Sequence, residues 1–327
     1  MTLRSPVLAR GAKRAKDPAE VARARPFLKW AGGKRAIVPR LLELLPPVIE
    51  TYYEPFLGGG ALFFALVARG VRFEKAVLAD QNEELVNCYQ VVRDDVKRVI
   101  AALRKHENTE HHYYRVREAD PSSLGPAEQA ARLIFLNRTG YNGLYRVNSK
   151  GRFNVPFGRY KKPRLDDAER LETASRALKK ARIDHRDFEK TVKNAGDRDF
   201  VYFDPPYVPL SLTANFTAYG QAGFAMDEQQ RLADLLRRLG RANVPALLSN
   251  SDCAATRTLY AGLDLGVVSV RRAINSVASG RGPVAEVLVR SFDYPVLSNP
   301  DGEPGRDSEA DGGAPRARDR RAGGKRA

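Results

Sequence analysis

The strongest constraint on the fold is an alternation of short apolar runs with helical patterns between residues 26 and 298. The runs that predict strands lie at 51–54, 75–79, 200–203, 245–249, 266–270 and 285–291. The patterns that predict helices lie at 34–45, 61–69, 83–92, 127–136, 227–239 and 253–260. Such alternation favours an α/β fold with a mainly parallel sheet covered by helices, and we expect an antiparallel pair to close the sheet.

One stretch, residues 96–182, interrupts this alternation. It is mostly helical in pattern and rich in arginine and aromatic residues, and its Asn142-Gly143 pair predicts a tight turn. We therefore predict a catalytic domain formed by residues 26–95 and 183–298, with residues 96–182 inserted as a mainly helical subdomain. Residues 1–25 and 299–327 have the composition of disordered tails, the first of them basic.

The charge of the chain indicates a polyanionic partner. The 327 residues carry a formal net charge of +16, and the pI is near 9.9. Residues 1–25 account for +5 of this charge and residues 299–327 for +1, so +10 remains on the part that is predicted to fold. A basic folded part makes a nucleic acid the leading class of partner.

The remaining composition excludes several other classes of protein. Cys88 and Cys253 show no CxxC spacing, which excludes a disulfide framework and a cysteine-rich zinc site and fits a reducing cytosol. His106, His111 and His112 are interpreted as the solvated face of a helix, and we expect no metal. No run approaches the roughly 18 apolar residues of a membrane span, so we expect an intracellular protein that does not enter the membrane.

The sequence most suggestive of chemistry is Asp204-Pro205-Pro206-Tyr207, which directly follows the apolar run 200–203. Proline fixes φ and lacks an N–H group, so the turn is stiff and leaves acceptors free. The Asp204 carboxylate and the Pro205 carbonyl are expected to accept from an exocyclic amino group of a nucleobase. Two acceptors around that nitrogen expose its lone pair for attack on a methyl group, and the carboxylate stabilises the positive charge that develops.

Tyr207 completes this predicted catalytic turn as a platform for the base. Stacking of a base on an aromatic ring contributes about 1 to 3 kcal/mol at sites that bind single strands. The competing interpretation is an ordinary strand-to-loop turn, since aspartate and proline are common in turns. Two consecutive prolines after an apolar strand are unusual for that interpretation.

A glycine-rich segment, residues 54–60, follows the first predicted strand and leads into a helix. Glycines there let the backbone approach a ligand closely. A dinucleotide fingerprint counted from Gly58 and Gly60 requires a small residue where Phe63 stands, which weakens a dehydrogenase interpretation. Asp80 ends the second predicted strand, where a carboxylate can bind ribose hydroxyls. The pair predicts a nucleoside-containing cofactor, and S-adenosylmethionine meets that description.

Together these segments resemble the Dam-type DNA adenine-N6 methyltransferases, the alpha group of amino methyltransferases. The resemblance covers about residues 26–295. It rests on Asp80 and on the segments 27–34 (FLKWAGGK), 54–60 (EPFLGGG), 136–144 (LNRTGYNGL), 153–160 (FNVPFGRY), 204–207 (DPPY) and 215–219 (NFTAY). The family implies a Rossmann-like fold for an S-adenosylmethionine-dependent methyltransferase, with an inserted subdomain that recognises DNA.

The resemblance also implies roles for individual residues. It implies that the target adenine is held by Asp204, Pro205 and Tyr207, and the cofactor by Trp30, Lys34, Phe56, Gly58, Gly60, Asp80 and Asp204. For DNA binding it implies Lys29, Tyr141, Asn142, Leu144, Arg146, Pro156 and Tyr160. Arg146 is expected to contact a guanine through two hydrogen bonds, and these readers resemble those of GATC. Tyr145 departs from the resemblance, because a small residue is expected there.

The sequence therefore predicts a site-specific enzyme that transfers a methyl group from S-adenosylmethionine to N6 of an adenine flipped out of duplex DNA, in GATC. We expect a cytoplasmic monomer, associated with the nucleoid through its DNA, that needs no metal. The alternatives are methylation of cytosine N4, methylation of adenine N6 in RNA, and a DNA-binding relative without catalysis.

Overall fold

The computed structural model describes residues 23–165, 167–208, 224–271 and 283–292, which all belong to one compact unit, Met1–Tyr294. The motif at 215–219 lies outside the described residues. The helices are α2 (Val38–Glu43), α3 (Ala61–Ala68), α4 (Glu83–Leu103), α5 (Glu110–Glu118), α6 (Pro126–Thr139), α7 (Ala168–Leu178), α8 (Phe188–Thr191), α10 (Met226–Arg241) and α11 (Ala254–Leu259), with 3₁₀ turns η1 (Lys34–Ala36), η2 (Pro121–Ser123) and η3 (Tyr141–Gly143). The strands are β1 (Thr51–Glu54), β2 (Lys75–Asp80), β3 (Ala181–His185), β4 (Phe200–Phe203), β5 (Ala246–Ser251), β6 (Asp264–Arg271) and β7 (Pro283–Arg290).

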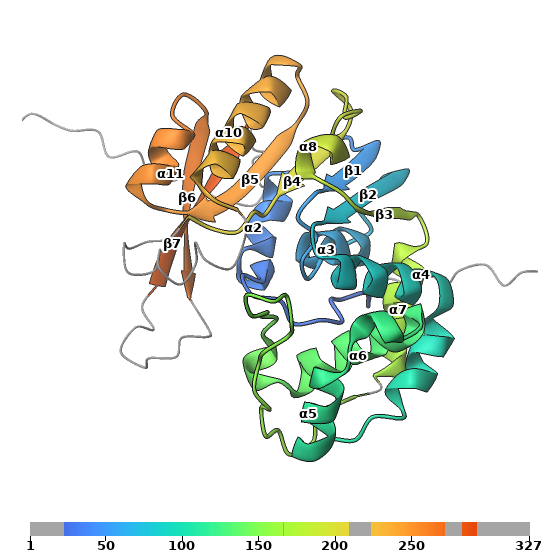
Figure 1. The fold of residues 1–327 in the computed structure, drawn as a ribbon. Helices are drawn as coiled ribbons and strands as arrows, with labels where there is room; N and C mark the ends of the chain where they lie inside the picture. Colours follow the sequence, from blue (N-terminus) through green and yellow to red (C-terminus); the bar gives the residue numbers. More distant parts are fainter. Residues whose placement is uncertain (1–22, 166, 209–223, 272–282, 293–327) are drawn as a thin grey trace, which may run out of the picture. The chain divides into compact units, whose positions relative to one another are not determined.

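All seven strands form one sheet in the order β3-β2-β1-β4-β5-β7-β6 (Figure 1). The first five in this order run parallel, and β7 lies antiparallel to both β5 and β6. This arrangement confirms the predicted α/β class, its Rossmann-like order and the antiparallel closing pair. From β1 the chain builds outward through β2 and β3, and from β4 outward in the other direction. The β1–β4 boundary is therefore the switch point, where α/β sheets bind ligands beyond the carboxyl ends of their strands.

Alternate residues of the central strands supply two different cores. On one face, Tyr52 of β1 and Phe200 of β4 pack with apolar residues of α3, α4, α6 and α7. On the other face, Tyr53 and Phe203 pack with α8, α10 and α11. Because side chains alternate along a strand, the continuous apolar runs at β1 and β4 indicate that both faces are covered. Burial on both faces fixes the two strands whose ends form the site.

Strand β3 was not among the predicted strands. Its five residues alternate buried and exposed, and they include Arg182, Asp184 and His185. As the outermost strand of the sheet, β3 carries polar side chains on its exposed positions and lacks the continuous apolar run by which the central strands were found. It begins at Ala181, inside the range predicted for the insert.

Helix α4 crosses the predicted boundary between residues 95 and 96. The helix runs from Glu83 to Leu103, but Asp95 leaves helical geometry with φ −141° and ψ 58°. The division into a catalytic domain and an insert stays a prediction. The predicted helix at 34–45 is in fact two short pieces, η1 and α2, because the chain turns at Ile37 before Pro39 occupies the first turn of α2.

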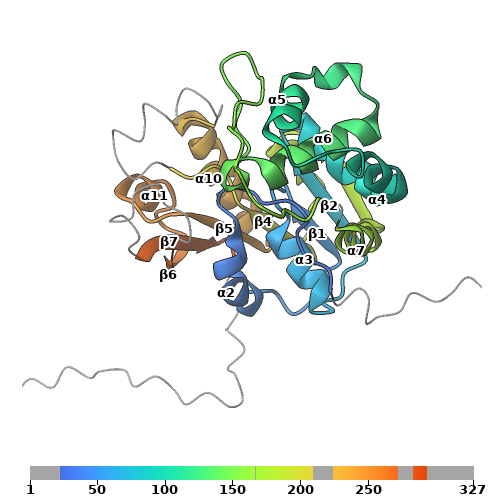
Figure 2. The same cartoon turned by 90° about the horizontal axis from the view of Figure 1, so that it is seen from below.

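After α5 and α6, the chain forms an irregular segment from Gly140 to Tyr160 that folds back on itself. Bridges join Gly140 to Phe157 and Val147 to Phe153, both antiparallel. Asn142 and Gly143 have φ of 55° and 64°, which confirms the tight turn predicted there. Figure 2 shows part of this segment as a light-green loop that projects away from the sheet. The helices described in the structure include none long and apolar enough for a bilayer crossing.

Candidate active site

The predicted catalytic turn and the glycine segment lie at the switch point of the sheet. Residues 204–207 directly follow β4, and residues 55–60 directly follow β1. These strands are parallel neighbours, with Tyr52 opposite Phe200 and Tyr53 opposite Val201. Their carboxyl ends therefore lie at one edge of the sheet, and the turn and the glycine segment start from the same place.

Asp204 is held by a lysine and a serine at the end of β4. Its Oδ1 lies 2.8 Å from Lys34 Nζ and accepts a hydrogen bond of 3.2 Å from Ser249 Oγ. The Lys34 side chain is only 4% exposed and that of Asp204 22% exposed. Burial raises the pKa of Asp204, and the Lys34 ammonium opposes that rise by favouring the carboxylate. The geometry is that of a paired carboxylate at the rim of a crevice.

Tyr207 stands beside this ion pair. Lys34 Nζ lies 4.3 Å from the centre of the Tyr207 ring, which is a cation–π distance. The Tyr207 hydroxyl donates to Glu286 Oε2 at 2.7 Å. One lysine therefore contacts both groups that are predicted to hold the target adenine, the carboxylate of Asp204 and the ring of Tyr207.

The backbone of the turn is fixed from β5 and α10. The Pro206 carbonyl accepts from Gln229 Nε2 at 2.7 Å, and the Val208 N–H donates to Asn250 Oδ1 at 3.1 Å. Gln229 and Asn250 are both buried and join each other by a hydrogen bond of 3.1 Å. Among the described residues, none donates to the Pro205 carbonyl, so this oxygen keeps the acceptor capacity that the prediction requires.

The glycine segment makes a close cradle against Trp30. A Cβ atom at Gly58 would lie 2.8 Å from Trp30 Cδ1, and the φ of Gly58 is 46°. Gly60, with φ 64°, starts α3 in the left-handed region. Tyr89 donates its hydroxyl to the Gly58 carbonyl at 3.2 Å. No residue other than glycine meets both the close approach and the φ at position 58.

Asp80 organises this loop from the end of β2. Its Oδ2 accepts from the Gly58 N–H and its Oδ1 from the Asn82 N–H, both at 2.9 Å. Burial raises the pKa of Asp80, and these backbone hydrogen bonds oppose the rise. Each carboxylate oxygen has further acceptor capacity, so the predicted contact with a ribose stays a prediction.

Phe56 lies in an aromatic cluster on the α8 and α10 side of the sheet. Its ring stacks on Phe188 with the centroids 5.5 Å apart and meets the edges of Phe203 and Phe224. Phe188 belongs to α8, which follows β3. The role of Phe56 in shaping the cofactor pocket stays a prediction.

Glu54, the last residue of β1, is a buried acid that the sequence reasoning did not single out. Its Oε2 accepts from the Tyr52 hydroxyl at 2.8 Å, and the residue is 2% exposed. Burial raises the pKa of Glu54 to about 8, the Tyr52 hydrogen bond lowers it, and the Asp204 and Asp80 carboxylates raise it. Three carboxyl groups therefore influence one another's pKa at the carboxyl ends of β1, β2 and β4.

A buried asparagine joins residues 29–34 to the irregular segment from Gly140 to Tyr160, which is called the reading loop because it carries most of the predicted DNA-binding residues. Asn137 of α6 accepts from the Lys29 N–H at 2.8 Å and donates Nδ2 to the carbonyls of Lys29 and Gly143, at 2.7 and 2.9 Å. A Cβ atom at Gly143 would come within 2.5 Å of Lys29 Cδ. Residues 29–34 therefore contact the reading loop through Lys29, the glycine segment through Trp30 and the catalytic turn through Lys34.

Several predicted DNA-binding residues meet around Tyr160. Lys29 Nζ lies 5.2 Å from the Tyr160 ring centre, and the Asn142 N–H donates to the Tyr160 hydroxyl at 3.0 Å. Tyr141, in the same turn, is 49% exposed, which is unusual for so large a ring. Leu144 is half-buried and packs against the core.

Arg146 and Pro156 lie on the strand-like arms of the projecting loop. Arg146 Nε donates to Asn154 Oδ1 at 2.7 Å, and both residues lie at the surface. Exposed Pro156 accepts from the Tyr141 N–H at 2.9 Å. Of the predicted DNA-binding residues, the structure thus gathers Lys29, Asn142 and Tyr160, places Tyr141 and Pro156 beside them, and holds Arg146 further along the loop.

The bulky Tyr145 fits the segment by stacking. Its ring lies 5.2 Å from that of Trp30 at an angle of 23° and meets the edge of Phe153 at 5.6 Å. Burial raises the pKa of its hydroxyl to about 12. The large ring that stands where a small residue was expected thus packs between Trp30 and Phe153.

The histidines do not form the solvated face that the sequence predicted. His112 is buried, His106 stacks on Phe135 at 4.6 Å, and their ring nitrogens lie 3.0 Å apart. The Arg115 guanidinium approaches the other nitrogen of His112 to 2.8 Å. Of these three histidines, only His111 is exposed. Over the described ranges, no three His, Cys, Asp or Glu side chains gather as a metal site, and the expectation of a metal-free protein stays a prediction.

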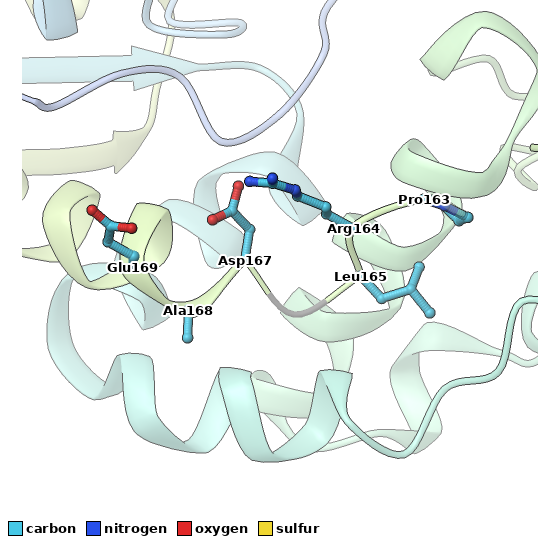
Figure 3. A pocket seen from close by; sticks show the side chains of 6 residues that line it. All are labelled: Pro163, Arg164, Leu165, Asp167, Ala168 and Glu169. Carbon is cyan, nitrogen blue, oxygen red and sulfur yellow. The ribbon is translucent and has the colours of Figure 1, made fainter. Parts of the chain in front are cut away.

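A surface hollow before α7 lies apart from this chemistry. It is lined by Pro163, Arg164, Leu165, Asp167, Ala168 and Glu169, and Figure 3 shows their side chains around the bend that leads into α7. None of the predicted site residues lines it.

Two of the four site residues that the sequence reasoning missed carry a weak sequence signal. Glu54 and Ser249 stand at or near the carboxyl ends of predicted strands, as Asp80 and Asp204 do, and a polar residue in such a place is a general sign of a site. Glu286 lies inside a strand and Asn137 inside a helix, so only their tertiary contacts distinguish them.

Comparisons with known proteins agree with this geometry. A sequence profile of the family described as D12 class N6 adenine-specific DNA methyltransferase matches residues 30–274. The Type II methyltransferase M1.LlaDCHI of Lactococcus lactis subsp. cremoris is 42% identical over 82% of this chain and 95% of its own length. The Type II methyltransferase M.MjaIII of Methanocaldococcus jannaschii is 40% identical over 82% of this chain and 99% of its own.

A third relative carries the same type of name as the family that the sequence resembles. The DNA adenine methylase of Escherichia coli K12 is 40% identical over 81% of this chain and 94% of its own length. Relatives with this identity over nearly their whole length show the family of the chain. The chain belongs to the D12 class of N6 adenine-specific DNA methyltransferases and methylates adenine in DNA at specific sites.

Proposed function

We propose that the chain uses S-adenosylmethionine as methyl donor and extrudes its target adenine from duplex DNA, in the sequence GATC, into the crevice beside residues 204–207. The observation that carries the proposal is the continuity of residues 29–34, which contact the glycine segment, the catalytic turn and the reading loop. One short segment spans the places proposed for the cofactor, the base and the rest of the DNA.

The glycine segment suits the cofactor for three reasons. The left-handed φ of Gly58 lets Trp30 pack directly against the loop, where a Cβ atom would lie 2.8 Å from Trp30 Cδ1, and Gly60 opens a helix N-terminus. The Asp80 carboxylate binds the loop backbone and keeps acceptor capacity, so it can receive hydrogen bonds from the hydroxyl groups of the donor. S-adenosylmethionine supplies an electrophilic methyl group when bound.

The protein groups would act on the adenine by orientation and charge. The Asp204 carboxylate and the Pro205 carbonyl accept from the two N–H bonds of N6, which directs the nitrogen lone pair away from the ring plane. Asp204 stabilises the positive charge that develops on N6, and Tyr207 stacks on the base. Extrusion costs a few kcal/mol, which the stacking and the hydrogen bonds offset. No covalent enzyme intermediate is required, since the amino nitrogen is the nucleophile.

The proposed recognition of GATC rests on the loop around Tyr160. Lys29, Asn142 and Tyr160 form one contact group, Tyr141 is exposed beside it, and Leu144 and Arg146 follow. Arg146 has an exposed guanidinium that is oriented by Asn154, as a bidentate contact to guanine requires. We further propose a protein that acts as a monomer in the cytoplasm on chromosomal DNA, without a metal.

Transfer of tritium from labelled S-adenosylmethionine tests the reaction. We expect label in adenine of duplex DNA, far less in RNA, and none in cytosine. Asp204→Ala should lower the rate by at least about a hundredfold, as loss of a charge-stabilising group does. Transfer at the parent rate by Asp204→Ala would refute the role of the carboxylate, and label in cytosine N4 would support the competing reaction.

Sequencing of methylated positions tests specificity separately. In a host without other adenine methylation, we expect modified adenine in GATC. Modification spread over unrelated sequences would exclude GATC while leaving the chemistry intact.

A further inference from the structure

The hydroxyl of Tyr207 forms a hydrogen bond with a residue of β7, a strand that carries none of the residues proposed for the reaction. It donates to Glu286 Oε2 at 2.7 Å, and Glu286 lies on β7. In the sheet, Glu286 is paired with Ser251 of β5 on one side and Val268 of β6 on the other. Because hydrogen bonds to both neighbours hold β7, the backbone that carries the acceptor is well fixed.

The Glu286 carboxylate accepts its hydrogen bond from the Tyr207 hydroxyl. Glu286 is half-buried, and within the described part of the chain no Lys, Arg or His lies at ion-pair distance from it. A partly buried carboxylate without a cation gains little for the stability of the fold. Its hydrogen bond is directed at the aromatic ring of the catalytic turn.

This bond constrains the Tyr207 ring itself, beside a side-chain contact of Tyr207 with Ser249. Pro206 and Val208 fix the backbone on either side of Tyr207 through Gln229 and Asn250. Backbone contacts leave the ring free to rotate about its side-chain bonds, and the Lys34 ammonium at 4.3 Å from the ring centre is not directional enough to set its tilt. A hydrogen bond to the hydroxyl fixes the far end of the ring.

We propose that Glu286 is a positioning residue for methyl transfer: its carboxylate holds the Tyr207 ring at the tilt at which the target adenine stacks. The inference rests on the proposed function, in which Tyr207 is the platform for the extruded base. Stacking is sensitive to tilt and offset, and a small misplacement of a reacting group lowers the rate strongly.

Two substitutions separate positioning from charge. Glu286→Gln keeps an oxygen that accepts from the Tyr207 hydroxyl but removes the negative charge beside Asp204. Glu286→Ala removes both the acceptor and the charge. Positioning predicts that Glu286→Gln keeps kcat within about threefold of the parent, while Glu286→Ala lowers kcat by about ten- to a hundredfold, as loss of a hydrogen bond to a charged group does.

A double-mutant cycle gives the decisive comparison. Tyr207→Phe removes the donor of the same bond, so it should lower kcat about as much as Glu286→Ala. The double variant Tyr207→Phe with Glu286→Ala should then be no slower than the worse single variant, because the bond is already lost. The Kd for S-adenosylmethionine and the melting temperature should change little, which a merely structural role does not predict.

Asp264→Asn is the matched control. Asp264 lies on β6, in the same strand pair, and forms an ion pair with Arg290 away from the turn. It should leave kcat unchanged. The inference is overturned if Glu286→Gln is as slow as Glu286→Ala, if the effects of the double variant multiply, or if Glu286→Ala is as fast as the parent. If Glu286→Ala does not fold, the cycle uses Glu286→Gln in its place, alone and together with Tyr207→Phe. The inference is overturned there as well if the loss of kcat in the double variant is the product of the losses in the two single variants.

A separate measurement tests the function on which the inference rests. Duplex DNA with 2-aminopurine at the target adenine should gain fluorescence when the parent protein binds, because the base leaves the stack. Absence of that gain would refute base extrusion. The cycle reads kcat on ordinary DNA, so the two failures are distinguishable.

Discussion

At the scale of single residues, Lys34 connects the parts of the site. Its ammonium is almost fully buried, contacts the Asp204 carboxylate and the Tyr207 ring, and donates to the Gly32 carbonyl. A buried ammonium is stable only with such partners, and in turn it opposes the rise in the pKa of Asp204 that burial causes. The same ammonium that pairs with Asp204 thus also covers one face of the Tyr207 ring.

Glu54 gives a first prediction at this scale, on proton release. Its folded pKa near 8 lies above the ordinary 4.5, so its protonated form dominates at pH 7 and its contribution to stability is lost as pH rises from 4.5 through 8. A cationic ligand lowers that pKa. Binding of S-adenosylmethionine at pH 7 should therefore release a proton, measured by calorimetry in two buffers of different ionisation enthalpy.

Glu54→Gln is the control for that measurement. It cannot titrate, so the binding heat should no longer depend on the buffer. Proton release of the same size in Glu54→Gln would assign it to another group.

Gly58→Ala gives a second prediction. The new Cβ would meet Trp30 at 2.8 Å, whereas at Gly70, which also has positive φ (69°), a new Cβ meets nothing within 4 Å. Both variants carry the left-handed penalty of about 1 kcal/mol. Only Gly58→Ala should lower cofactor affinity, by about tenfold or more. Equal affinity of the two variants in a titration would show that Trp30 and Gly58 do not shape the site.

At the scale of elements, the site depends on α6 as much as on the strands. Asn137 lies in the last turn of α6, is 1% exposed and binds main-chain groups of Lys29 and Gly143. A buried amide that satisfies the backbones of two loops fixes their relative position. The reading loop is thereby attached to the segment that carries Trp30 and Lys34.

Asn137→Ala should lower the free energy of unfolding by about 3 kcal/mol, because it leaves one buried and two part-buried backbone groups without their partner. Asn87→Ala, which removes one surface hydrogen bond to the Pro126 carbonyl, should change it by less than about 0.5 kcal/mol. Denaturant titration of both variants measures the difference. Similar values for the two would mean that α6 does not hold the loops.

At the scale of the whole molecule, stability should depend on pH through the buried histidines. Burial lowers the pKa of His106 to about 4 and also lowers that of His112, for which Arg115 adds to the shift. The unfolded chain binds protons near pH 6.5 and the folded one does not, so the stabilisation is complete above pH 6.5 and is lost as pH falls toward 4.

The melting temperature should therefore fall between pH 7 and pH 5. His106→Phe, which keeps an aromatic ring on Phe135, should flatten that dependence. An unchanged slope in the variant would exclude His106 as its source.

Much of the fold and the site was predictable from the sequence, because the responsible residues act locally. Strands buried on both faces leave continuous apolar runs, and Asp80 and Asp204 stand directly at strand ends. Strand β3 was missed because half of its side chains point to solvent. The histidine cluster was misassigned because the burial of His106 and His112 comes from packing against α6. Glu286 could not be found since strand pairing, not spacing, brings it to Tyr207.

The contacts of residues 29–34 with three parts of the site have a thermodynamic consequence. If cofactor binding shifts this segment, it changes the affinity for DNA, and DNA binding must then change the affinity for the cofactor by the same factor. The coupling free energy between cofactor binding and DNA binding can therefore be measured from either equilibrium. The ratio of cofactor dissociation constants with and without duplex DNA should equal the ratio of DNA dissociation constants with and without cofactor.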